Sequence, residues 1–573
     1  MITPMTRYSF ILLRGDKEAF LAGLQQLGVV DITRSAKPVD NYSQDLLDNI
    51  GTLRRDIDCL RKGRDETLSE LEAGRDALLQ ELRDIAPWGE YERERLAAFG
   101  LHYYRVAARK FDPAWAEQYA LQVVDELDGS IRFVIAGDNT GFPVKELPAP
   151  KHTPSELEPE LRRYEERIAA HRKVLEARKA DIPQMERQIG RLQTELDRYL
   201  AGVSSVSAAE DTLDTLTGFA PSECDAAVTE ALDKAGVFYI KDEASVEHNP
   251  PIQLKNNKFV RMFEVLTDMY GRPAYDGFDP TPFIAVFFLL FFAMCMGDAG
   301  YGLVLILAGL ALKKVDGFRD MAPLVTVLGA ATVVTGFFLH TFFSIDIAQW
   351  PCFAGIRGIF LPDEIAGYAG GMVLSLAVGV VHLCLAMVVK AVGAVRLRGF
   401  AASLGTLGWT LLIVGGVIVG GIALTGVLSS AAVRWTVIVL GVVSALGIFV
   451  FNDPHRNKFA NIGMGLWDTY NTVTGLLGDV LSYLRLYALG LAGAMLGMAF
   501  NDMGRMVLGD GSNAVLWIPF ILLVLVGHTL NIAMCALGAF VHPLRLNFLE
   551  FFKNSGYEGS GRKFNPLSNT NNK

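Results

Sequence analysis

The sequence has few cysteines, no recognisable catalytic motif and few charges in its second half. Its six cysteines are scattered without a CxxC pair, which argues against a disulfide framework and against a zinc site. It has no GxxxxGK[ST] phosphate loop and no nucleophile elbow, so it predicts no catalytic site in this chain. The N-terminus also lacks the apolar segment and small-residue cleavage site of a signal peptide, and we therefore expect the polar part to stay in the cytoplasm.

Charge divides the 573 residues into two parts. Residues 1–280 contain 49 acidic and 36 basic residues, whereas residues 281–573 contain 13 and 17. This contrast excludes both a single soluble domain and a pure membrane bundle. The first part is net acidic, so it lacks the basic surface that nucleic-acid binding requires. We expect a cytoplasmic domain over 1–280 and a membrane domain over 281–573.

The polar part is predicted to contain α/β lobes. Residues 7–13, 17–27 and 29–32 have the patterns of a strand, an amphipathic helix and a strand, with Gly28 ending the helix. A similar strand-helix-strand unit follows at 213–242. We assign one lobe to residues 1–42 together with 205–270, and a second lobe to 88–150.

Between the lobes, apolar residues recur at alternating steps of three and four, which is typical of a coiled coil. The first such seam lies in residues 43–86, loosens after Gly63 and stops at Pro87; it begins with Leu46, Ile50, Leu53, Ile57 and Leu60. The second lies in residues 155–200, where His171 and Arg178 occupy two seam positions and Pro183 is expected to kink the helix. The two seams predict a long antiparallel coiled-coil hairpin, about 60 Å long at 1.5 Å per residue.

The second part contains eight apolar stretches, and they predict an α-helical membrane domain with eight transmembrane helices: 282–298, 299–312, 321–345, 366–389, 402–427, 431–451, 472–500 and 514–549. Eight crossings place both termini on one side. Twelve basic residues of the loops and tails lie on that side and three on the other, so the positive-inside rule predicts cytoplasmic N- and C-termini.

Two arginines are left inside apolar helices. An arginine at membrane depth costs about 2.5 to 3.5 kcal/mol and cannot escape by deprotonation, so it needs a partner or a water-filled cavity. Arg485 lies about 14 residues from either end of its stretch, where snorkelling is difficult, and we expect a functional role. Arg545 lies nearer the cytoplasmic end, so function and snorkelling past Glu550 are both open.

The last stretch also carries a polar or small stripe at alternating steps of three and four, formed by His528, Asn531, Cys535, Gly538, His542 and Arg545. On a helix these residues share one face over about 26 Å, close to the hydrocarbon thickness. Such a stripe either hydrogen-bonds neighbouring helices or lines an aqueous route. The row ending in an arginine favours the route.

Several segments give the chain a strong resemblance to subunit I of prokaryotic V/A-type rotary ATPases, called subunit a in the eukaryotic vacuolar enzyme. They follow the family's order along almost the whole chain: 27–32 (LGVVDI), 254–257 (LKNN), 279–283 (DPTPF), 297–302 (GDAGYG), 379–383 (GVVHL), 478–486 (GDVLSYLRL) and 542–552 (HPLRLNFLEFF). The last two motifs are specific and contain the two arginines.

The resemblance implies a stator and ion-channel subunit in a prokaryotic plasma membrane, with no cofactor beyond the transported H⁺ or Na⁺. Its expected partners are the rotor-ring proteolipid subunits, peripheral-stalk subunits, a central-stalk cap subunit and the lipid bilayer. Arg485 and Arg545 are the expected ion-translocation residues. The half-channel candidates are Glu550, His528, His542, Asn531, Asp479, Ser482 and Asp298. For Asp298, capping of a tight turn is an equally good interpretation.

Two other classes of function remain as alternatives. A secondary transporter with a cytoplasmic rod would also use intramembrane arginines, but it would tend to show an internal repeat, which the sequence lacks. A receptor or scaffold would use the coiled coil but leaves Arg485 without a purpose. The sequence does not distinguish H⁺ from Na⁺, because that choice depends mainly on the ring subunit.

Overall fold

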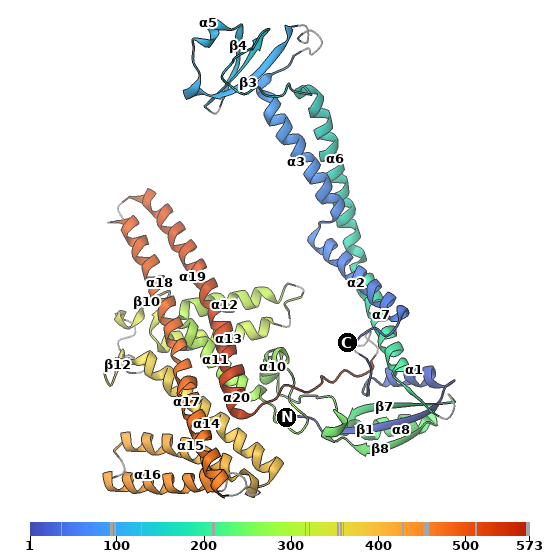
Figure 1. The fold of residues 1–573 in the computed structure, drawn as a ribbon, viewed down its shortest axis with the longest axis vertical. Helices are drawn as coiled ribbons and strands as arrows, with labels where there is room; N and C mark the ends of the chain where they lie inside the picture. Colours follow the sequence, from blue (N-terminus) through green and yellow to red (C-terminus); the bar gives the residue numbers. More distant parts are fainter. Residues whose placement is uncertain are drawn as a thin grey trace. The chain divides into compact units, whose positions relative to one another are not determined.

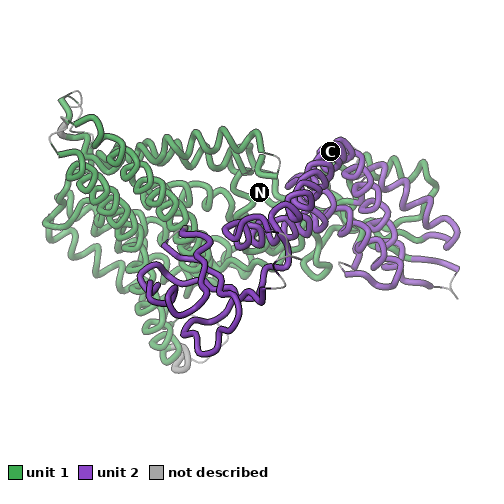
Figure 2. The backbone as a smooth tube through the Cα atoms, turned by 90° about the horizontal axis from the view of Figure 1, so that it is seen from above, with its two compact units in different colours: residues 1–11, 29–32, 215–566 green, residues 12–28, 33–214, 567–573 purple. Residues whose placement is uncertain are grey.

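The computed structural model describes residues 1–35, 37–91, 96, 99–127, 129–208, 212–315, 317–319, 321–351, 355, 358, 360–426, 429–450, 458–509 and 513–568. The cysteine Cys352 and three of the basic residues counted in the loops and tails of 281–573, Arg357, Arg456 and Lys573, lie outside these ranges. The chain forms two compact units (Figure 2). The first consists of residues 1–11, 29–32 and 215–566, and the second of residues 12–28, 33–214 and 567–573.

Two pairs of helices dominate the second unit. Helix α2 (Asn41–Lys62) packs along α7 (Ile182–Val203), and α3 (Glu66–Ile85) packs along α6 (Pro154–Arg178) (Figure 1). The predicted seam residues form the contact between α2 and α7, where Leu46, Ile50 and Ile57 meet Ile189, Leu196 and Leu200. The sequence therefore predicted both helical segments and their apolar faces, while the supercoiling of a coiled coil stays a prediction.

Both helical segments are interrupted near their middle. Gly63 ends α2 in the left-handed conformation, with φ of 61°, and Asp65 starts α3 by accepting the Leu68 N–H at 2.8 Å. A 3-10 turn (Lys179–Asp181) separates α6 from α7, with Pro183 in the first turn of α7. A kink was predicted at Pro183; the structure instead interrupts the α-helix immediately before this proline, at the 3-10 turn. His171, a polar seam residue, lies 2.8 Å from Asp65 across the pair.

A small lobe connects α3 to α6. Its antiparallel sheet has the order β3 (Leu101–Ala107), β5 (Ser130–Ala136) and β4 (Leu121–Leu127). The short helix α5 (Trp115–Gln118) lies beside it. Tyr104, Phe133 and Ile135 are almost fully buried in its core.

The first unit contains a sheet of order β2 (Asp31–Ile32), β7 (Leu213–Pro221), β1 (Met5–Leu13) and β8 (Phe238–Glu243). The predicted helices are present as α8 (Asp225–Ala235) in this unit and as α1 (Lys17–Leu27) in the second unit, where Gly28 ends α1 with φ of 69°. The short helices α9 (Lys258–Arg261) and α10 (Glu264–Tyr270) lead to the apolar part.

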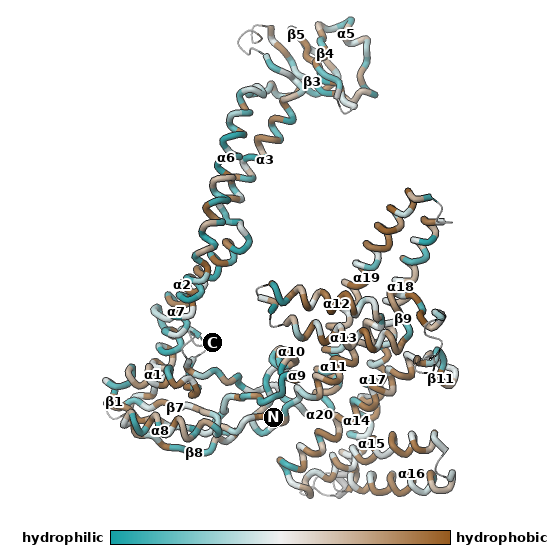
Figure 3. The backbone as a smooth tube through the Cα atoms, turned by 180° about the vertical axis from the view of Figure 1, so that it is seen from behind, coloured by the Kyte–Doolittle hydropathy of each residue, from teal (hydrophilic) through white to brown (hydrophobic). Residues whose placement is uncertain are grey.

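The apolar part is helical, and Figure 3 shows hydrophobic residues along almost the whole of its helices. Three are short: α11 (Thr281–Met296), α12 (Ala299–Leu312) and α13 (Ala322–Phe338). The others are α14 (Gly370–Arg398), α15 (Leu404–Leu424), α16 (Ser430–Ala445), α17 (Lys458–Ser482), α18 (Leu484–Leu508), α19 (Trp517–Arg545) and α20 (Phe552–Ser555).

Within the described residues, five helical stretches are long and apolar enough to cross a membrane: Gly370–Arg398, Ala401–Leu424, Ser430–Val450, Ile462–Leu508 and Ala514–Ser555. With the three shorter helices they coincide with the eight predicted apolar stretches, and the count of eight crossings stays a prediction. Helix α13 ends earlier than the predicted stretch 321–345, because the chain turns into the short strands β9 (Thr341–Phe342) and β10 (Ile345–Asp346). A second short hairpin, β11 (Glu364–Ile365) and β12 (Tyr368–Ala369), precedes α14.

Candidate functional site

Arg485 lies at a tightened turn between α17 and α18. Tyr483 separates the two helices, and its N–H bonds to the Val480 carbonyl, three residues back. Leu486 bonds to the Tyr483 carbonyl with the same spacing. Arg485 is partly exposed, but its Nη1 atom is buried and has no hydrogen-bond partner among the described residues. An arginine in a candidate membrane span therefore keeps an unsatisfied donor, which costs free energy unless a partner arrives.

Arg545 directly precedes a widened turn at the end of α19, and Glu550 lies within that turn. The helix passes into a π-helical turn (Leu546–Phe551) directly after Arg545. Arg545 is exposed, whereas Glu550 is only 4% exposed and its Oε2 atom has no hydrogen-bond partner among the described residues. The Ser482 hydroxyl donates to the Gly478 carbonyl at 3.0 Å, and both Ser482 and Arg485 lie close enough to act electrostatically on the Glu550 carboxylate. The turns on the two helices thus bring a guanidinium, a hydroxyl and a carboxylate into one region.

His542 belongs to the same region. Its Nδ1 atom is buried and unpartnered in the described part of the chain, and the charges of Arg485 and Arg545 both act on its ring. Asp479 borders this group: Lys553 (3.3 Å) and Asn554 (2.7 Å) hold its carboxylate, and Asn554 also donates to the Glu550 carbonyl at 2.6 Å. Of the predicted residues, the structure therefore brings Ser482, Arg485, His542 and Glu550 together and ties Asp479 to α20.

The first three residues of the predicted stripe, His528, Asn531 and Cys535, belong to one hydrogen-bond network. His528 Nε2 lies 3.0 Å from Asn501 Oδ1, and His528 Nδ1 lies 2.7 Å from the Tyr301 hydroxyl. Asn531 donates to Tyr301 and to the Gly493 carbonyl, each at 2.8 Å, and accepts from Cys535 at 3.3 Å. A neutral His528 with its proton on Nε2 satisfies every one of these groups. His528 and Asn531 thus link α19 to α12 and α18.

Asp298 caps the turn between α11 and α12. Its carboxylate accepts four backbone N–H groups: Gly300 (2.8 Å), Tyr301 (3.1 Å), Phe343 (2.9 Å) and Ser344 (2.5 Å). It is only 4% exposed, and these bonds compensate for its burial. The capping interpretation of Asp298 is therefore confirmed, and a channel role stays a prediction.

Sequence reasoning missed His382, Tyr483, Tyr301 and Asn501, all of which contribute to these contacts. Tyr483, Tyr301 and His382 belong to motifs that the sequence analysis quoted, but nothing in the sequence indicated a functional contact for any of the three. The residues that they contact are far away along the chain: Asn501 and His528 are 27 residues apart, and His382 and Tyr483 are 101 residues apart. A helical period reveals a face of a helix but not the helix that it meets.

A pocket of about 260 Å³, mostly apolar but with a few polar side chains, lies between residues 361–371 and α18. His340 and Asp363 line it, together with Tyr487 and Gly490 of α18. His340 Nδ1 lies 3.0 Å from Asp346 and its Nε2 atom 3.3 Å from Asp363, so two carboxylates flank one ring. This pocket reaches α18 within two residues of Arg485.

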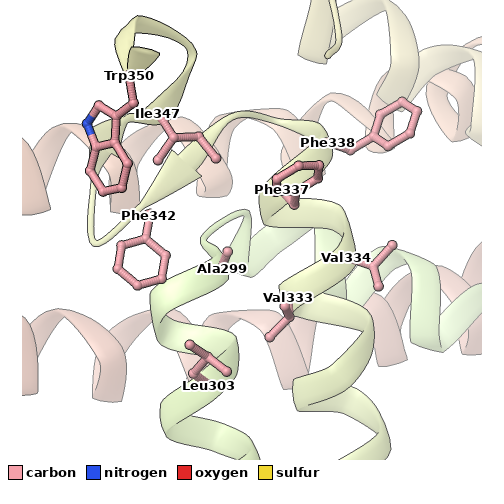
Figure 4. A pocket seen from close by; sticks show the side chains of 9 residues that line it. All are labelled: Ala299, Leu303, Val333, Val334, Phe337, Phe338, Phe342, Ile347 and Trp350. Carbon is pink, nitrogen blue, oxygen red and sulfur yellow. The ribbon is translucent and has the colours of Figure 1, made fainter. Parts of the chain in front are cut away.

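A second pocket, of about 420 Å³, is entirely apolar in its lining (Figure 4). Ala299 and Leu303 come from α12 and Val333 and Phe337 from α13, while Phe342, Ile347 and Trp350 come from the segment after α13. No carboxylate, hydroxyl or imidazole group lines it. It suits an apolar guest and offers nothing that would hold an ion.

Comparison with known proteins finds a family that matches the segments containing these residues. A family described as the V-type ATPase 116kDa subunit family matches residues 149–317 and 467–569, and these two ranges include all nine predicted site residues. The A-type ATP synthase subunit I of Pyrococcus abyssi is 31% identical over 458 residues, covering 75% of this chain and 65% of that protein. The chain is therefore similar to this family over both matched ranges and to a subunit I over three quarters of its own length.

Other relatives agree with this family. The A-type ATP synthase subunit I of Methanocaldococcus jannaschii is 32% identical over 368 residues, 59% of this chain and 52% of that protein. The V-type ATP synthase subunit I 1 of Treponema pallidum is 27% identical over 527 residues, 85% of this chain and 82% of that protein. The chain spans about half to two thirds of the length of the archaeal relatives that it matches.

Proposed function

We propose that this chain is the non-catalytic membrane subunit I of an A/V-type rotary ATP synthase, and that it moves H⁺ or Na⁺ to and from the rotor ring. The relatives named ATP synthase subunit I support this proposal. The observation that carries it is the buried, unpartnered Nη1 atom of Arg485 inside a candidate membrane span. Because the described residues leave this donor of Arg485 unsatisfied, the guanidinium suits a transient interaction with a carboxylate of a ring subunit.

The coupling follows from electrostatics. A carboxylate on a ring subunit must be neutral while it faces lipid, either protonated or bound to Na⁺, because an exposed charge there is expensive. When it rotates to face Arg485, the positive charge favours its ionised form and the ion leaves. Arg485 also blocks a direct leak between the two aqueous routes.

We assign the two routes to opposite sides of Arg485. Glu550, His542, Ser482 and Asp479 would line the cytoplasmic half-channel, with Arg545 beside it. The other half-channel would use the pocket bounded by His340, Asp363 and Tyr487. His528, Asn531 and Asp298 would lie along its far wall, where their saturated hydrogen bonds hold the helices in place.

The ring would pack on an exposed apolar surface of α17 to α19. Exposed side chains recur there at steps of three and four: Leu466, Tyr470, Val473, Leu477 and Leu481 on α17; Leu491, Met495 and Met498 on α18; Leu530, Met534, Leu537 and Val541 on α19. A face of this kind suits lipid or other apolar helices.

The remaining parts would act as a stator. We propose that the helix pairs α2–α7 and α3–α6 form an antiparallel coiled coil, and that the lobes bind peripheral-stalk subunits and a central-stalk cap subunit. Eight crossings would place both termini in the cytoplasm, in a prokaryotic plasma membrane.

The decisive experiment replaces Arg485 in the assembled complex. We expect Arg485→Ala to abolish ATP-driven ion uptake by membrane vesicles while the complex still assembles. Arg485→Lys should also fail, since a buried lysine is readily neutralised and lacks the planar fork. Arg505→Ala, on the same helix but 68% exposed at its side chain, serves as the matched control. Uptake at the unmutated rate with Arg485→Ala would refute the proposed function.

A further inference from the structure

His382 of α14 lies where both arginine-bearing helices depart from regular geometry. Its side chain is fully buried, and its Nδ1 atom lies 2.9 Å from the Tyr483 hydroxyl. Tyr483 is the residue of the tightened turn that precedes Arg485, and it is fully buried as well. The hydrogen bond therefore joins α14 directly to the turn that aims Arg485.

The same imidazole ring also packs on the π-helical turn (Leu546–Phe551) that follows Arg545. It stacks on Phe551, with centroids 4.7 Å apart and planes 4° from parallel, and on Phe287 of α11 at 4.2 Å. Phe551 is the last residue of the π-helical turn and the neighbour of Glu550. The position of this turn thus depends on a ring whose other side is fixed by α11.

α14 is shaped to accept Tyr483. Gly379 lies one turn before His382, and a Cβ atom at this position would collide with the Tyr483 ring. His382 Nε2 has no hydrogen-bond partner among the described residues, so the bond to Tyr483 is the one polar contact that they give the ring. A fully buried imidazole held in this way is costly, and packing alone would be better served by phenylalanine.

We propose that His382 is a positioning residue for ion translocation: its hydrogen bond to Tyr483 sets the orientation of Arg485, and its stacking on Phe551 sets the distance from Arg485 to Glu550. The inference rests on the proposed function of Arg485 and extends it. The side chain of His382 on α14 contacts both the tightened turn at Tyr483 and the widened turn that ends at Phe551, and so fixes their relative position. Interruptions of this type inside helices are common at functional sites.

The test measures ATP-driven ion uptake per assembled complex in vesicles that contain the whole enzyme. His382→Phe keeps the ring and removes Nδ1, whereas Tyr483→Phe removes only the hydroxyl. We expect each variant to lower uptake per complex about two- to tenfold, the effect of losing one buried neutral hydrogen bond. The double variant should be no slower than the slower single variant, because both changes remove the same interaction.

Three comparisons make the outcome decisive. Cys384→Ala, on α14 outside this cluster, should pump at the unmutated rate, and Gly379→Ala should reproduce the loss by displacing the Tyr483 ring. If His382→Phe fails to assemble, Tyr483→Phe, which removes a single oxygen, carries the test. A merely structural role would reduce the amount of complex and leave uptake per complex unchanged in Tyr483→Phe, and this result would overturn the proposal.

Arg485→Ala is measured in the same series. If it pumps normally, the proposed function is wrong. If it stops pumping while Tyr483→Phe and Gly379→Ala pump at the unmutated rate, Arg485 keeps its role and the positioning role of His382 is wrong.

Discussion

Arg485 and Glu550 interact electrostatically without neutralising each other. The charge of the guanidinium acts on the carboxylate, yet Arg485 Nη1 and Glu550 Oε2 are both buried without a hydrogen-bond partner among the described residues. A fully formed salt bridge would satisfy both groups and leave the arginine with little attraction for a third. The Arg485 guanidinium therefore keeps an unsatisfied donor, as the proposed interaction with a ring carboxylate requires.

Glu550→Gln tests whether this carboxylate carries ions. Glutamine preserves the volume of the side chain and removes its ability to bind and release a proton. We expect ATP-driven uptake per complex to fall about tenfold, equivalent to ~1.4 kcal/mol. Glu558→Gln, an exposed acid eight residues on, is the matched control. Uptake within twofold of the unmutated rate would remove Glu550 from the route.

Arg545→Ala separates a channel role from snorkelling. The arginine is exposed and its charge acts on His542, so we expect a partial loss, about three- to tenfold, rather than the complete loss expected for Arg485→Ala. Initial rates of uptake in vesicles with matched amounts of complex measure the difference. Transport at the unmutated rate would show that Arg545 only snorkels to the surface.

The sequence predicted features that are local along the chain. Gly28 ends a helix in the left-handed conformation, as predicted, whereas at Gly63 only a loosening of the seam was expected and the structure shows the end of a helix. The apolar faces of α2 and α7 followed from heptad spacing, since each face is visible in its own segment. Arg485 and Arg545 stood out because a charge inside an apolar helix needs an explanation wherever that helix lies.

Features that depend on a second segment were not predictable. The apolar run continues past Phe338, so hydropathy did not show that α13 ends there and turns into a hairpin. The predicted stretch 472–500 is part of a helical run over Ile462–Leu508, because Asp468 and Asn471 lower the hydropathy without breaking the helix. The sandwich of His382 between Phe287 and Phe551 joins three helices, and no periodicity in one of them indicates it.

Asp298→Asn distinguishes a cap from a channel residue. The asparagine amide would place N–H groups against the Ser344 N–H, where Asp298 Oδ2 now accepts a hydrogen bond. We expect a loss of about 1–3 kcal/mol in stability, the cost of an unsatisfied buried group. Less subunit should then enter the complex, as measured by its recovery after affinity purification, while uptake per complex stays unchanged. A selective fall in uptake per complex would instead support the half-channel role.

Asp65 is expected to make the N-terminal end of α3 sensitive to acid. Burial raises the pKa of its carboxyl group, but the Leu68 N–H and the His171 ring lower it more, so the pKa lies below its ordinary value. A carboxylate with a depressed pKa in the folded state contributes stability above the pKa of the unfolded chain, and this contribution is lost as the pH falls through the folded value. At neutral pH the contribution is fully present.

Two substitutions separate the effect of the Asp65 capping hydrogen bond from the effect of its charge. Asp65→Ala removes both the cap of α3 and the charge, and we expect it to cost about 1 kcal/mol at neutral pH. Asp65→Asn keeps a good capping oxygen and loses only the charge that faces His171, so it should cost less. Hydrogen exchange of the first amides of α3 measures both effects, with Asp76→Asn, an exposed acid on the same helix, as the control. The difference between Asp65→Asn and the unmutated chain should vanish below the pKa of Asp65; a difference that persists in acid would exclude the carboxylate charge as its cause.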